Sequence, residues 1–389
     1  MLRGGAMADL PVIQDAWIAL SNGVIYDFGA MSELSGISAI REIDARDRFV
    51  FPSFTDSHTH LVFADSREDE FVMKIKGKSY HAIAASGGGI LNSAKKIQRL
   101  EESELYMRCL PRLEEIIRTG TGAVEIKSGY GLTLKDELKM LRVARRIRDE
   151  SPLTVKITFL GAHAVPEGMD KSSYVRLVKD EMIPAVASEK LADYVDVFCE
   201  HGFFSDADTR EILEAGLRYG LKGRVHANQL SRSGGVQAGV ACGAVSVDHL
   251  ENIGQEEIDA LKNTNTIPTA LPGAAFFLGL PFPPARQMLD EGLPLAIASD
   301  YNPGSSPSGN MPLMVSLACI RMKLTPEEAF NATTLNTAAA LELSDTHGSI
   351  TRGKVANLFI TKPMPSLAYM PYVYGTSMVE TVILNGKVY

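Results

Sequence analysis

Two histidines separated by a single residue, His58 and His60, stand at the end of an apolar run that starts at Phe49. The run is rich in aromatic and β-branched residues, which favour a strand. Alternate side chains of a strand point to one face, so both imidazoles would leave its carboxyl end on the same side. Imidazole is a common ligand for zinc and other transition metals. The pair therefore predicts a metal site, and the alternative is two hydrogen-bonded core histidines.

Further titratable residues recur along the chain, each at or just after another short β-forming segment. They are His163, His201, His226, His249 and Asp300. His81 is expected in a loop or a helix instead. The carboxyl ends of parallel strands meet at one face of a barrel, where these side chains would gather. The pattern therefore indicates one shared site built from several strand ends.

The elements that must position these residues alternate between strands and helices. After the opening run, strand-like segments follow at 122–127, 154–160, 194–199, 223–226, 244–248, 266–271 and 293–298. Helical patterns lie at 102–118, 134–148, 172–188 and 206–219, and a capping box with proline starts a further helix at Thr325. Alternation predicts parallel strands, and eight units predict an α/β fold of the (β/α)8 TIM-barrel type. The segment at 266 is the weakest, because Pro268 interrupts it.

Both ends of the chain consist of short β-segments without a helical period. The expected strands are 16–20, 23–26, 356–361 and 379–384, and Asn385-Gly386 predicts a hairpin after the last of them. We therefore predict a small discontinuous β-sandwich domain formed by residues 1–48 and 349–389. Residues 49–348 form the predicted barrel domain.

The composition is that of a globular protein, with 22% charged and 45% hydrophobic residues among 389. A net charge of -8, without any basic block, argues against a nucleic-acid or anionic-membrane partner. Four scattered cysteines without a Cys-x-x-Cys pair fit a reducing compartment. The sequence shows neither a signal-peptide core nor an apolar run of membrane-spanning length, so we expect a cytoplasmic protein.

The motifs at the strand ends resemble those of the amidohydrolase superfamily: the His-x-His strand, a later strand-end histidine, Asp-His-Leu and a terminal Ser-Asp. Four longer blocks resemble its imidazolonepropionase family, namely Ser57–Phe63 with Arg67, Lys127–Leu132, Gly161–Pro166 and Asp300–Ser305. The resemblance runs from about Phe51 to the end of the chain. It implies hydrolysis of the ring of 4-imidazolone-5-propanoate to N-formimidoyl-L-glutamate in histidine breakdown.

Carried over position by position, the resemblance implies that His58, His60, His226 and Asp300 bind one Zn2+ or Fe3+ ion per subunit. Such an ion lowers the pKa of water from about 15.7 toward about 7 and polarises a carbonyl. Binuclear relatives use a carboxylated lysine on the fourth strand, where this chain reads Phe198-Cys-Glu-His201. We therefore expect one metal, and Lys127 on the second strand is expected to be structural.

Two residues, Asp300 and His249, are expected to take part in proton transfer. Asp300 would take a proton from the attacking water, and His249 would stabilise the oxyanion or shuttle a proton. The alternatives are ordinary structural roles, with His226 and His249 as core histidines and Asp300 as a helix cap before Pro303.

The remaining matches imply contacts with the substrate, made by Arg67, Tyr130, His163, Asn302, Gly304 and Ser305. Arginine is a planar bidentate donor for a carboxylate such as the propionate group. The alternative for Arg67 is a surface ion pair with Glu68 or Asp69. Tyr130 lies between two glycines, which permit unusual backbone angles.

Two positions depart from the resemblance. Gln229 stands where family members often have glutamate, and an amide can hydrogen-bond a ring nitrogen but cannot serve as a base. We therefore assign Gln229 to binding and leave proton transfer to Asp300 and His249. Asn357 stands where the superfamily usually has aspartate, and we expect only a structural effect. The N-terminal β-segment is also short for the family.

Two other functions are weighed against this one. Another amidohydrolase acting on a small N-heterocycle would use similar ligands, but a deaminase would need a carboxylate soon after His226, where the chain has Asn228-Gln229. A barrel kept only as a binding protein would have lost ligands, and all four are present. The expected partner is a small-molecule substrate, and the resemblance also implies a homodimer.

Overall fold

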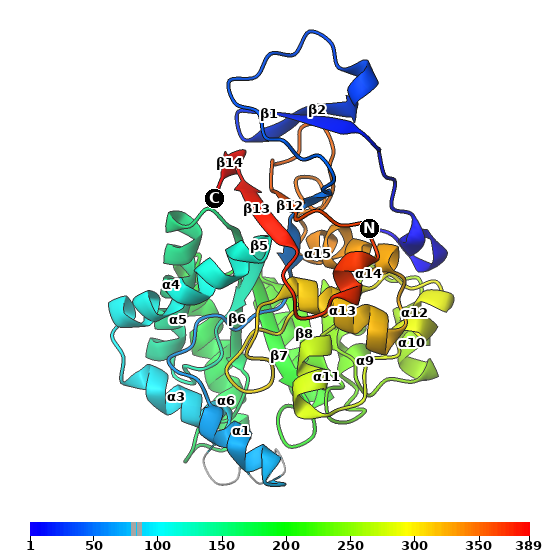
Figure 1. Ribbon diagram of the computed structural model, residues 1–389. Coiled ribbons are helices and arrows are strands. Elements are labelled where there is room, and N and C mark those ends of the chain that lie inside the picture. The colour runs from blue at the N-terminus through cyan, green and yellow to red at the C-terminus, as the bar shows by residue number, and fades with distance from the viewer. Residues whose placement is uncertain (79–82, 84–87) are drawn as a thin grey trace.

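The computed structural model describes residues 1–78, 83 and 88–389, and His81 lies outside these residues. The described part contains three sheets and a surrounding set of helices (Figure 1). An eight-stranded sheet forms the centre of the larger part. A two-stranded and a four-stranded sheet lie at the upper end in Figure 1, and helix α1 (Glu68–Ile75) lies at the opposite end.

The strands of the central sheet are all parallel and follow one another in chain order. They are β4 (Phe54–Asp56), β5 (Thr121–Lys127), β6 (Thr154–Ala162), β7 (Tyr194–Cys199), β8 (Lys222–Ala227), β9 (Ser246–His249), β10 (Ile267–Ala270) and β11 (Ala296–Ile297). Each expected strand is present, so the (β/α)8 architecture predicted from the alternation is confirmed. In β10, the Ile267 N–H donates to the Val245 carbonyl just before β9, so the backbone of the next residue, Pro268, faces β11. The pairing of β10 with β11 starts only at Thr269, so no ladder bond needs the N–H that Pro268 lacks.

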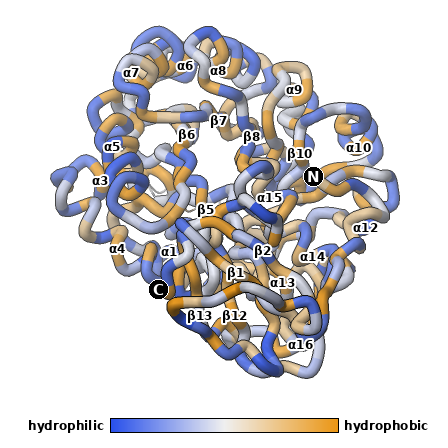
Figure 2. The backbone as a smooth tube through the Cα atoms, turned by 90° about the horizontal axis from the view of Figure 1, so that it is seen from above, coloured by the Kyte–Doolittle hydropathy of each residue, from blue (hydrophilic) through white to orange (hydrophobic). Residues whose placement is uncertain are grey.

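Helices cover the outside of this sheet, and Figure 2 shows α6 to α9 around strands β6 to β8. They are α3 (Ile90–Gln98), α4 (Glu102–Arg118), α5 (Leu134–Glu150), α6 (Lys171–Leu177), α7 (Ile183–Ser188), α8 (Asp206–Arg218), α9 (Gly235–Ala241), α10 (Gln255–Leu261), α11 (Pro272–Leu278), α12 (Ala285–Asp290), α13 (Met311–Met322), α14 (Pro326–Thr333), α15 (Leu335–Ala340) and α16 (Tyr369–Tyr372). The predicted capping box begins α14, where the Thr325 side chain and Glu328 bond reciprocally.

The helix expected at 172–188 is present, but it is not α-helical throughout. A π-helical turn, Val178–Met182, joins α6 to α7. Pro184 near the start of α7 has no N–H to donate to the preceding turn, so the regular i to i−4 ladder cannot continue through it.

The apolar run at 49–56 also differs from the single strand expected. It divides into β3 (Val50–Pro52), which pairs with β12 (Leu358–Thr361), and β4, which pairs with β5. The chain changes sheets at Pro52-Ser53, where proline cannot donate to a ladder. The histidines His58 and His60 still follow directly on the end of β4.

The two ends of the chain form the smaller sheets. One contains β1 (Ala16–Ser21) and β2 (Val24–Ala30), and the other contains β3, β12, β13 (Val379–Leu384) and β14 (Lys387–Val388). The predicted Asn385-Gly386 hairpin joins β13 to β14. The side-chain amide of Asn357 ties this sheet to the barrel, because it donates to the Gly122 carbonyl and accepts from the Asn385 N–H.

The barrel closes at its carboxyl end rather than along β4 and β11. A bridge joins Thr59 to Tyr301, and the Asp300 N–H donates to the His58 carbonyl over 3.0 Å. Two predicted metal ligands are therefore held side by side by the backbone contact that closes the barrel.

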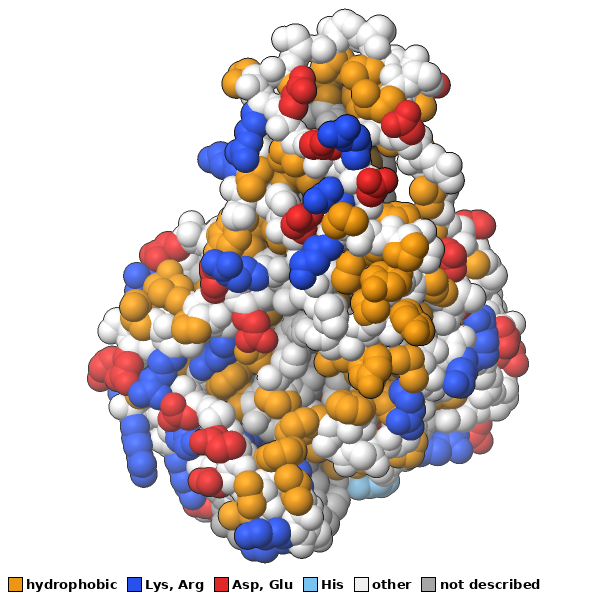
Figure 3. All heavy atoms as spheres, viewed as in Figure 1, with side chains coloured by type: hydrophobic (Ala, Val, Ile, Leu, Met, Phe, Trp, Pro, Cys, Tyr) orange, Lys and Arg blue, Asp and Glu red, His pale blue; other side chains and the backbone are white. Residues whose placement is uncertain are grey.

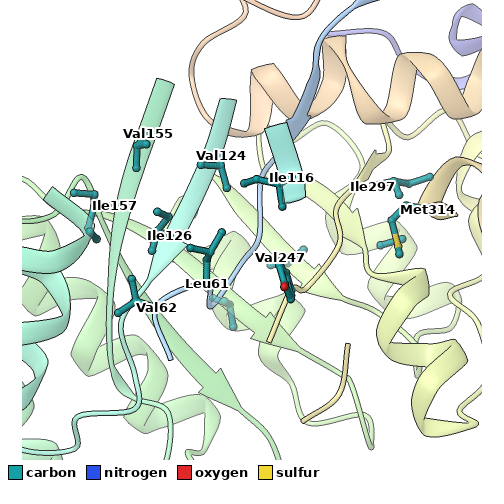
Figure 4. Packing of buried hydrophobic residues seen from close by; sticks show 14 of the residues in the cluster. Leu61, Val62, Ile116, Val124, Ile126, Val155, Ile157, Val247, Ile297 and Met314 are labelled. Atoms are coloured by element: carbon teal, nitrogen blue, oxygen red, sulfur yellow. The ribbon is translucent and has the colours of Figure 1, made fainter. Parts of the chain in front are cut away.

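Aliphatic side chains fill the layer between strands and helices. Figure 4 shows Val124 and Ile126 of β5 beside Val155 and Ile157 of β6, with Ile116 of α4 packed nearby. Their burial supplies the hydrophobic stabilisation that holds the strand ends in place. On the face drawn in Figure 3, positive and negative side chains are interspersed. Among the described residues, no helix combines the length and apolar character needed to cross a membrane.

Candidate active site

Four side chains from three separate strand ends converge on one point. The Nε2 atom of His226 lies 3.1 Å from Nε2 of His58 and 3.3 Å from Nε2 of His60. Asp300 Oδ1 lies 3.6 Å from Nε2 of His58 and 3.6 Å from Nε2 of His60. Ligand atoms about 2.0–2.2 Å from a zinc ion stand about 3.3–3.6 Å apart at the corners of a tetrahedron. The spacing and chemistry of these donors therefore fit a bound metal ion.

The protonation of the three imidazoles supports the same fit. All three rings are buried, and burial lowers the pKa of His58, His60 and His226 from the usual value. For His226, burial outweighs the nearby Asp196, which acts in the opposite direction. Neutral imidazoles whose Nε2 atoms crowd together need a cation between them. The cluster is that of a metal-binding site.

Two of the histidines are held from behind by buried carboxylates. His58 Nδ1 lies 2.7 Å from Asp248 Oδ2, and His226 Nδ1 lies 3.1 Å from Asp196 Oδ2. Such partners fix the tautomer and aim Nε2 at the metal position. Neither aspartate was predicted from the sequence, although a charge inside an apolar strand such as Tyr194–Cys199 was an available signal.

Two buried cations balance these carboxylates. Lys127 Nζ lies 2.7 Å from Glu125 Oε1 and 2.8 Å from Asp196 Oδ2. Arg224 Nη2 lies 3.2 Å from Asp248 Oδ2. Arg224 also donates to the carbonyl oxygens of Ser57 and Ala340, which fixes its guanidinium beside Asp248. Lys127 is thus engaged by two carboxylates, the environment of a structural lysine.

Asp300, one of the four converging donors, and His249 both line the pocket, and both have unusual environments. Burial raises the pKa of Asp300 to about 6, although His249 opposes the shift. Burial alone would lower the pKa of His249, but Glu251 and Asp300 outweigh it, so the net shift is upward. Glu251 Oε1 lies 3.4 Å from His249 Nδ1. The sequence offered no spacing signal for Glu251.

The backbone at these two residues is strained. His249 has φ 88° and Asp300 has φ 55°, in the left-handed region that side chains other than glycine rarely adopt. Neither is a helix cap, since the helix that follows Asp300 starts at Met311 with Asn310 as its cap. Such strain costs about 1–3 kcal/mol per residue and clusters at functional sites.

A pocket opens above the ligands. Its lining residues are His60, Arg67, Ile90, Tyr130, His163, Phe198, His226, Gln229, His249, Asp300, Asn302 and Ser305. The structure thus brings together the predicted substrate-binding side chains and the predicted metal site. Ile90 and Phe198 were not predicted, because apolar wall residues carry no chemical signature in the sequence. His201 is exposed and lies outside this lining.

Arg67 is the cation of this pocket. Its side chain is only 4% exposed, and within the described part of the chain its Nε and Nη1 atoms have no hydrogen-bond partner. Among the described residues Arg67 forms an ion pair with Glu70, whose buried Oε2 lies 3.8 Å from Nε, rather than with Glu68 or Asp69 at the surface. A Cβ on Gly304 would lie 1.3 Å from Arg67 Nη2, so the bare backbone at 304 makes room for the guanidinium. Two unused donors at a buried guanidinium suit a carboxylate ligand.

Aromatic rings form the wall next to the metal ligands. The His163 ring stacks on His60 with centroids 5.1 Å apart and lies 5.3 Å from Tyr130. His163 Nδ1 lies 3.0 Å from the Gly129 carbonyl oxygen, and burial lowers the pKa of His163 to about 3. The neutral ring therefore donates from Nδ1 to that carbonyl and keeps Nε2 as an acceptor.

The loop after β11 is organised by Asn302. Its Oδ1 atom accepts the N–H groups of Gly304 and Ser305, each over 2.8 Å. Its Nδ2 atom donates to the Asp300 carbonyl over 2.6 Å. The Ser305 hydroxyl lies 3.2 Å from Asp300 Oδ2. Asn302 therefore shapes the loop that presents Ser305 and makes room for Arg67.

The sequence matches known proteins over nearly its whole length. The model of the family described as "Amidohydrolase family" matches residues 49–389. A protein named imidazolonepropionase from Christiangramia forsetii is 53% identical, over 99% of this chain and 94% of that protein. Proteins of the same name from Flavobacterium johnsoniae and Geobacillus kaustophilus are 52% and 42% identical, covering 100% and 98% of this chain and 95% and 92% of theirs.

Solved structures show the same fold at low identity. A 5-methylcytosine deaminase from Klebsiella pneumoniae with 5-fluorocytosine superposes with a TM-score of 0.76 at 17% identity, over 95% of this chain and 93% of that one. A zinc-bound adenosine deaminase from Xanthomonas campestris has a TM-score of 0.68 at 18% identity, over 97% and 88%. These likenesses concern the barrel architecture alone.

Proposed function

Because the chain belongs to the amidohydrolase family and, within it, to the imidazolonepropionases, we propose that its pocket hydrolyses the ring of 4-imidazolone-5-propanoate to N-formimidoyl-L-glutamate in histidine breakdown. The observation that carries this proposal is the placement of the buried Arg67 guanidinium, whose Nε and Nη1 atoms have no hydrogen-bond partner among the described residues, beside a cluster of three imidazoles and one carboxylate. One end of the pocket suits a carboxylate, and the other suits hydrolysis of a cyclic amide.

The proposed metal ligands are His58, His60, His226 and Asp300, and three nitrogen donors with one oxygen donor suit one zinc or iron ion. When bound there, the ion supplies Lewis acidity, which polarises the ring carbonyl and lowers the pKa of water. Asp196 and Asp248 hold two of the imidazoles in the orientation that binding requires.

The substrate is anchored by its carboxylate and by its ring. Arg67 would bind the propionate group through its buried guanidinium, in which the described residues leave Nε and Nη1 without a hydrogen-bond partner. Tyr130 and His163 would contact the substrate from the aromatic wall. Gln229 offers both a donor and an acceptor to the ring nitrogens, whose hydrogen-bonding needs differ.

Hydrolysis adds the oxygen of water to the ring carbonyl carbon and breaks the carbon–nitrogen bond, and a proton goes to the departing nitrogen. Asp300 would take the proton of the water, because its buried carboxylate stands where the imidazoles of His58 and His60 converge. His249 stands beside Asp300, with Glu251 behind its Nδ1, and would stabilise the oxyanion. Asp300 and His249 would together transfer the protons, which the amide of Gln229 cannot do.

Substitution of Arg67 tests the proposed substrate. Arg67→Gln should raise KM for 4-imidazolone-5-propanoate by about 10–100-fold, because a charge-assisted hydrogen bond contributes about 1.5–3 kcal/mol. The measurement is the loss of ultraviolet absorbance of the ring, with Arg218→Gln at the exposed end of α8 as the control. A ring analogue without the carboxylate should be turned over equally by wild type and Arg67→Gln. An unchanged KM in Arg67→Gln would contradict the proposed binding of the propionate group.

A further inference from the structure

The substrate loop after β5, Ser128–Leu132, is held by a single buried carboxylate. Glu137 of α5 accepts the Gly131 N–H over 2.7 Å and the Leu132 N–H over 2.9 Å on Oε1, and the Gly129 N–H over 3.0 Å on Oε2. The side chain of Glu137 is fully buried, and it lies in the first turn of its helix. Three orphan N–H groups of an irregular loop are thus satisfied by one residue.

These contacts reach two residues that line the pocket. Tyr130 lies between two of the bound N–H groups, so its backbone is fixed on both sides. His163 donates from Nδ1 to the carbonyl of Gly129, whose own N–H binds Glu137. The orientation of both side chains therefore depends on the same carboxylate, although they come from different strands.

The loop has little freedom to take another shape around Glu137. Gly129 has φ 109°, and a Cβ on Gly131 would lie 2.4 Å from the backbone nitrogen of Glu137. The loop thus packs directly on the start of α5. The pKa of Glu137 is raised by burial, while Ser128 and the three N–H groups act in the opposite direction.

We propose that Glu137 is a positioning residue for substrate binding, which sets Tyr130 and His163 in the pocket by holding the Ser128–Leu132 loop. The proposal rests on the proposed function, since it concerns binding of that substrate. Glu137 lies outside the pocket lining, so it acts only through the residues that it holds. The metal ligands come from β4, β8 and β11, and none belongs to this loop.

Glu137→Gln is the test variant. The glutamine oxygen can still accept from Gly131 and Leu132, but its amide would face the Gly129 N–H, donor against donor. We expect KM for 4-imidazolone-5-propanoate to rise about tenfold and kcat to change less than about threefold, because binding is disturbed rather than the reacting centre. Glu328→Gln, the same change in a buried helix-capping glutamate away from the pocket, should leave KM unchanged.

A double-mutant cycle distinguishes positioning from general loss of structure. If Glu137 acts through Tyr130, the effects of Glu137→Gln and Tyr130→Phe on KM should combine to less than the product of the two single changes. Metal content and far-ultraviolet circular dichroism show whether each variant is folded and loaded. If Glu137→Gln does not fold, Glu137→Asp, which keeps the charge on a shorter side chain, gives the same comparison. A KM equal to that of wild type, or fully multiplicative effects, would overturn the positioning role, whereas absence of turnover by the wild type would overturn the proposed function instead.

Discussion

Gly304 and Arg67 form the closest steric match in the pocket. A single methyl group at position 304 would occupy the place of Arg67 Nη2. We expect Gly304→Ala to displace the guanidinium and raise KM by about tenfold or more, the loss expected when a carboxylate contact is weakened. The measurement is steady-state kinetics with 4-imidazolone-5-propanoate.

The control for this substitution is Gly5→Ala near the N-terminus, where an added Cβ meets nothing within 4 Å and the backbone, like that of Gly304, is not left-handed. Wild-type KM in Gly304→Ala would show that Arg67 does not need its present position to bind substrate.

Gln229 stands at the position where family members often have glutamate, so an amide replaces a carboxylate there. Gln229→Glu would place a second negative charge in a pocket that receives an anionic substrate beside Asp300. We expect KM to rise by about threefold to tenfold, because a like charge opposes binding. Gln255→Glu on the surface helix α10 is the matched control. If Gln229→Glu leaves both KM and kcat unchanged, the binding role of Gln229 is wrong.

The residues whose chemistry is local could be predicted from the sequence, and their supporting partners could not. His58 and His60 share one strand end, so their spacing suggested a metal site, and the resemblance of the same motif to the family implied the role of Arg67. Asp196 and Asp248 act on histidines of other strands that folding brings to them, while Glu137 and Glu251 act on nearby residues through the shape of their loops. A carboxylate that holds another residue has no spacing rule of its own, which is why these four were missed.

His347 links the segment that precedes β12 to the start of β6 in the barrel. Its Nε2 atom lies 2.9 Å from the Thr154 hydroxyl at the start of β6, and its Nδ1 atom lies 2.8 Å from the Thr346 hydroxyl. Burial, and then Lys354, lower the pKa of His347 to about 4. The unfolded chain, with a histidine pKa of about 6.5, binds more protons between these values, so stability falls as the pH falls from 6.5 to 4.

His347→Gln should therefore lose less stability than the wild type between pH 7 and pH 5, by about 2 kcal/mol. The comparison uses thermal unfolding midpoints of both proteins at the two pH values, with the exposed His201→Gln as a control that should follow the wild type. Equal losses in wild type and His347→Gln would show that this histidine does not sense the pH in the folded protein.

The order of strands and helices could be predicted because each is encoded by a local pattern. The helix from Glu102 to Arg118 and the capping box at Thr325 match the structure at residue level. The division of the run at 49–56 between two sheets, and the π-helical turn before α7, could not be predicted. At each of these two places a proline lacks the N–H that a regular strand or helix would use. The tertiary structure then decides where the neighbouring backbone groups find their hydrogen-bond partners.

At the scale of the whole molecule, the metal ion should stabilise the fold as well as the chemistry. Its four ligands join β4, β8 and β11, and two of them lie at the contact that closes the barrel. A ligand that binds only the folded state stabilises it by about 4 kcal/mol at a thousandfold excess over Kd. Removal of metal by a chelator should therefore lower the thermal midpoint of the wild type.

His226→Ala should have lost the metal and should not respond to the chelator. The control is His163→Gln, which changes a pocket histidine outside the ligand set and should keep the chelator-dependent shift. A chelator effect of equal size in His226→Ala would place the stabilising ion elsewhere.

The most direct test of the account is a titration of metal-free protein with zinc or iron(II), followed by the turnover of 4-imidazolone-5-propanoate. If each chain binds one metal ion, activity should be absent without metal and should rise linearly to a plateau at one ion per chain. Full turnover by the metal-free protein, or a plateau reached only at two tightly bound ions per chain, would contradict it.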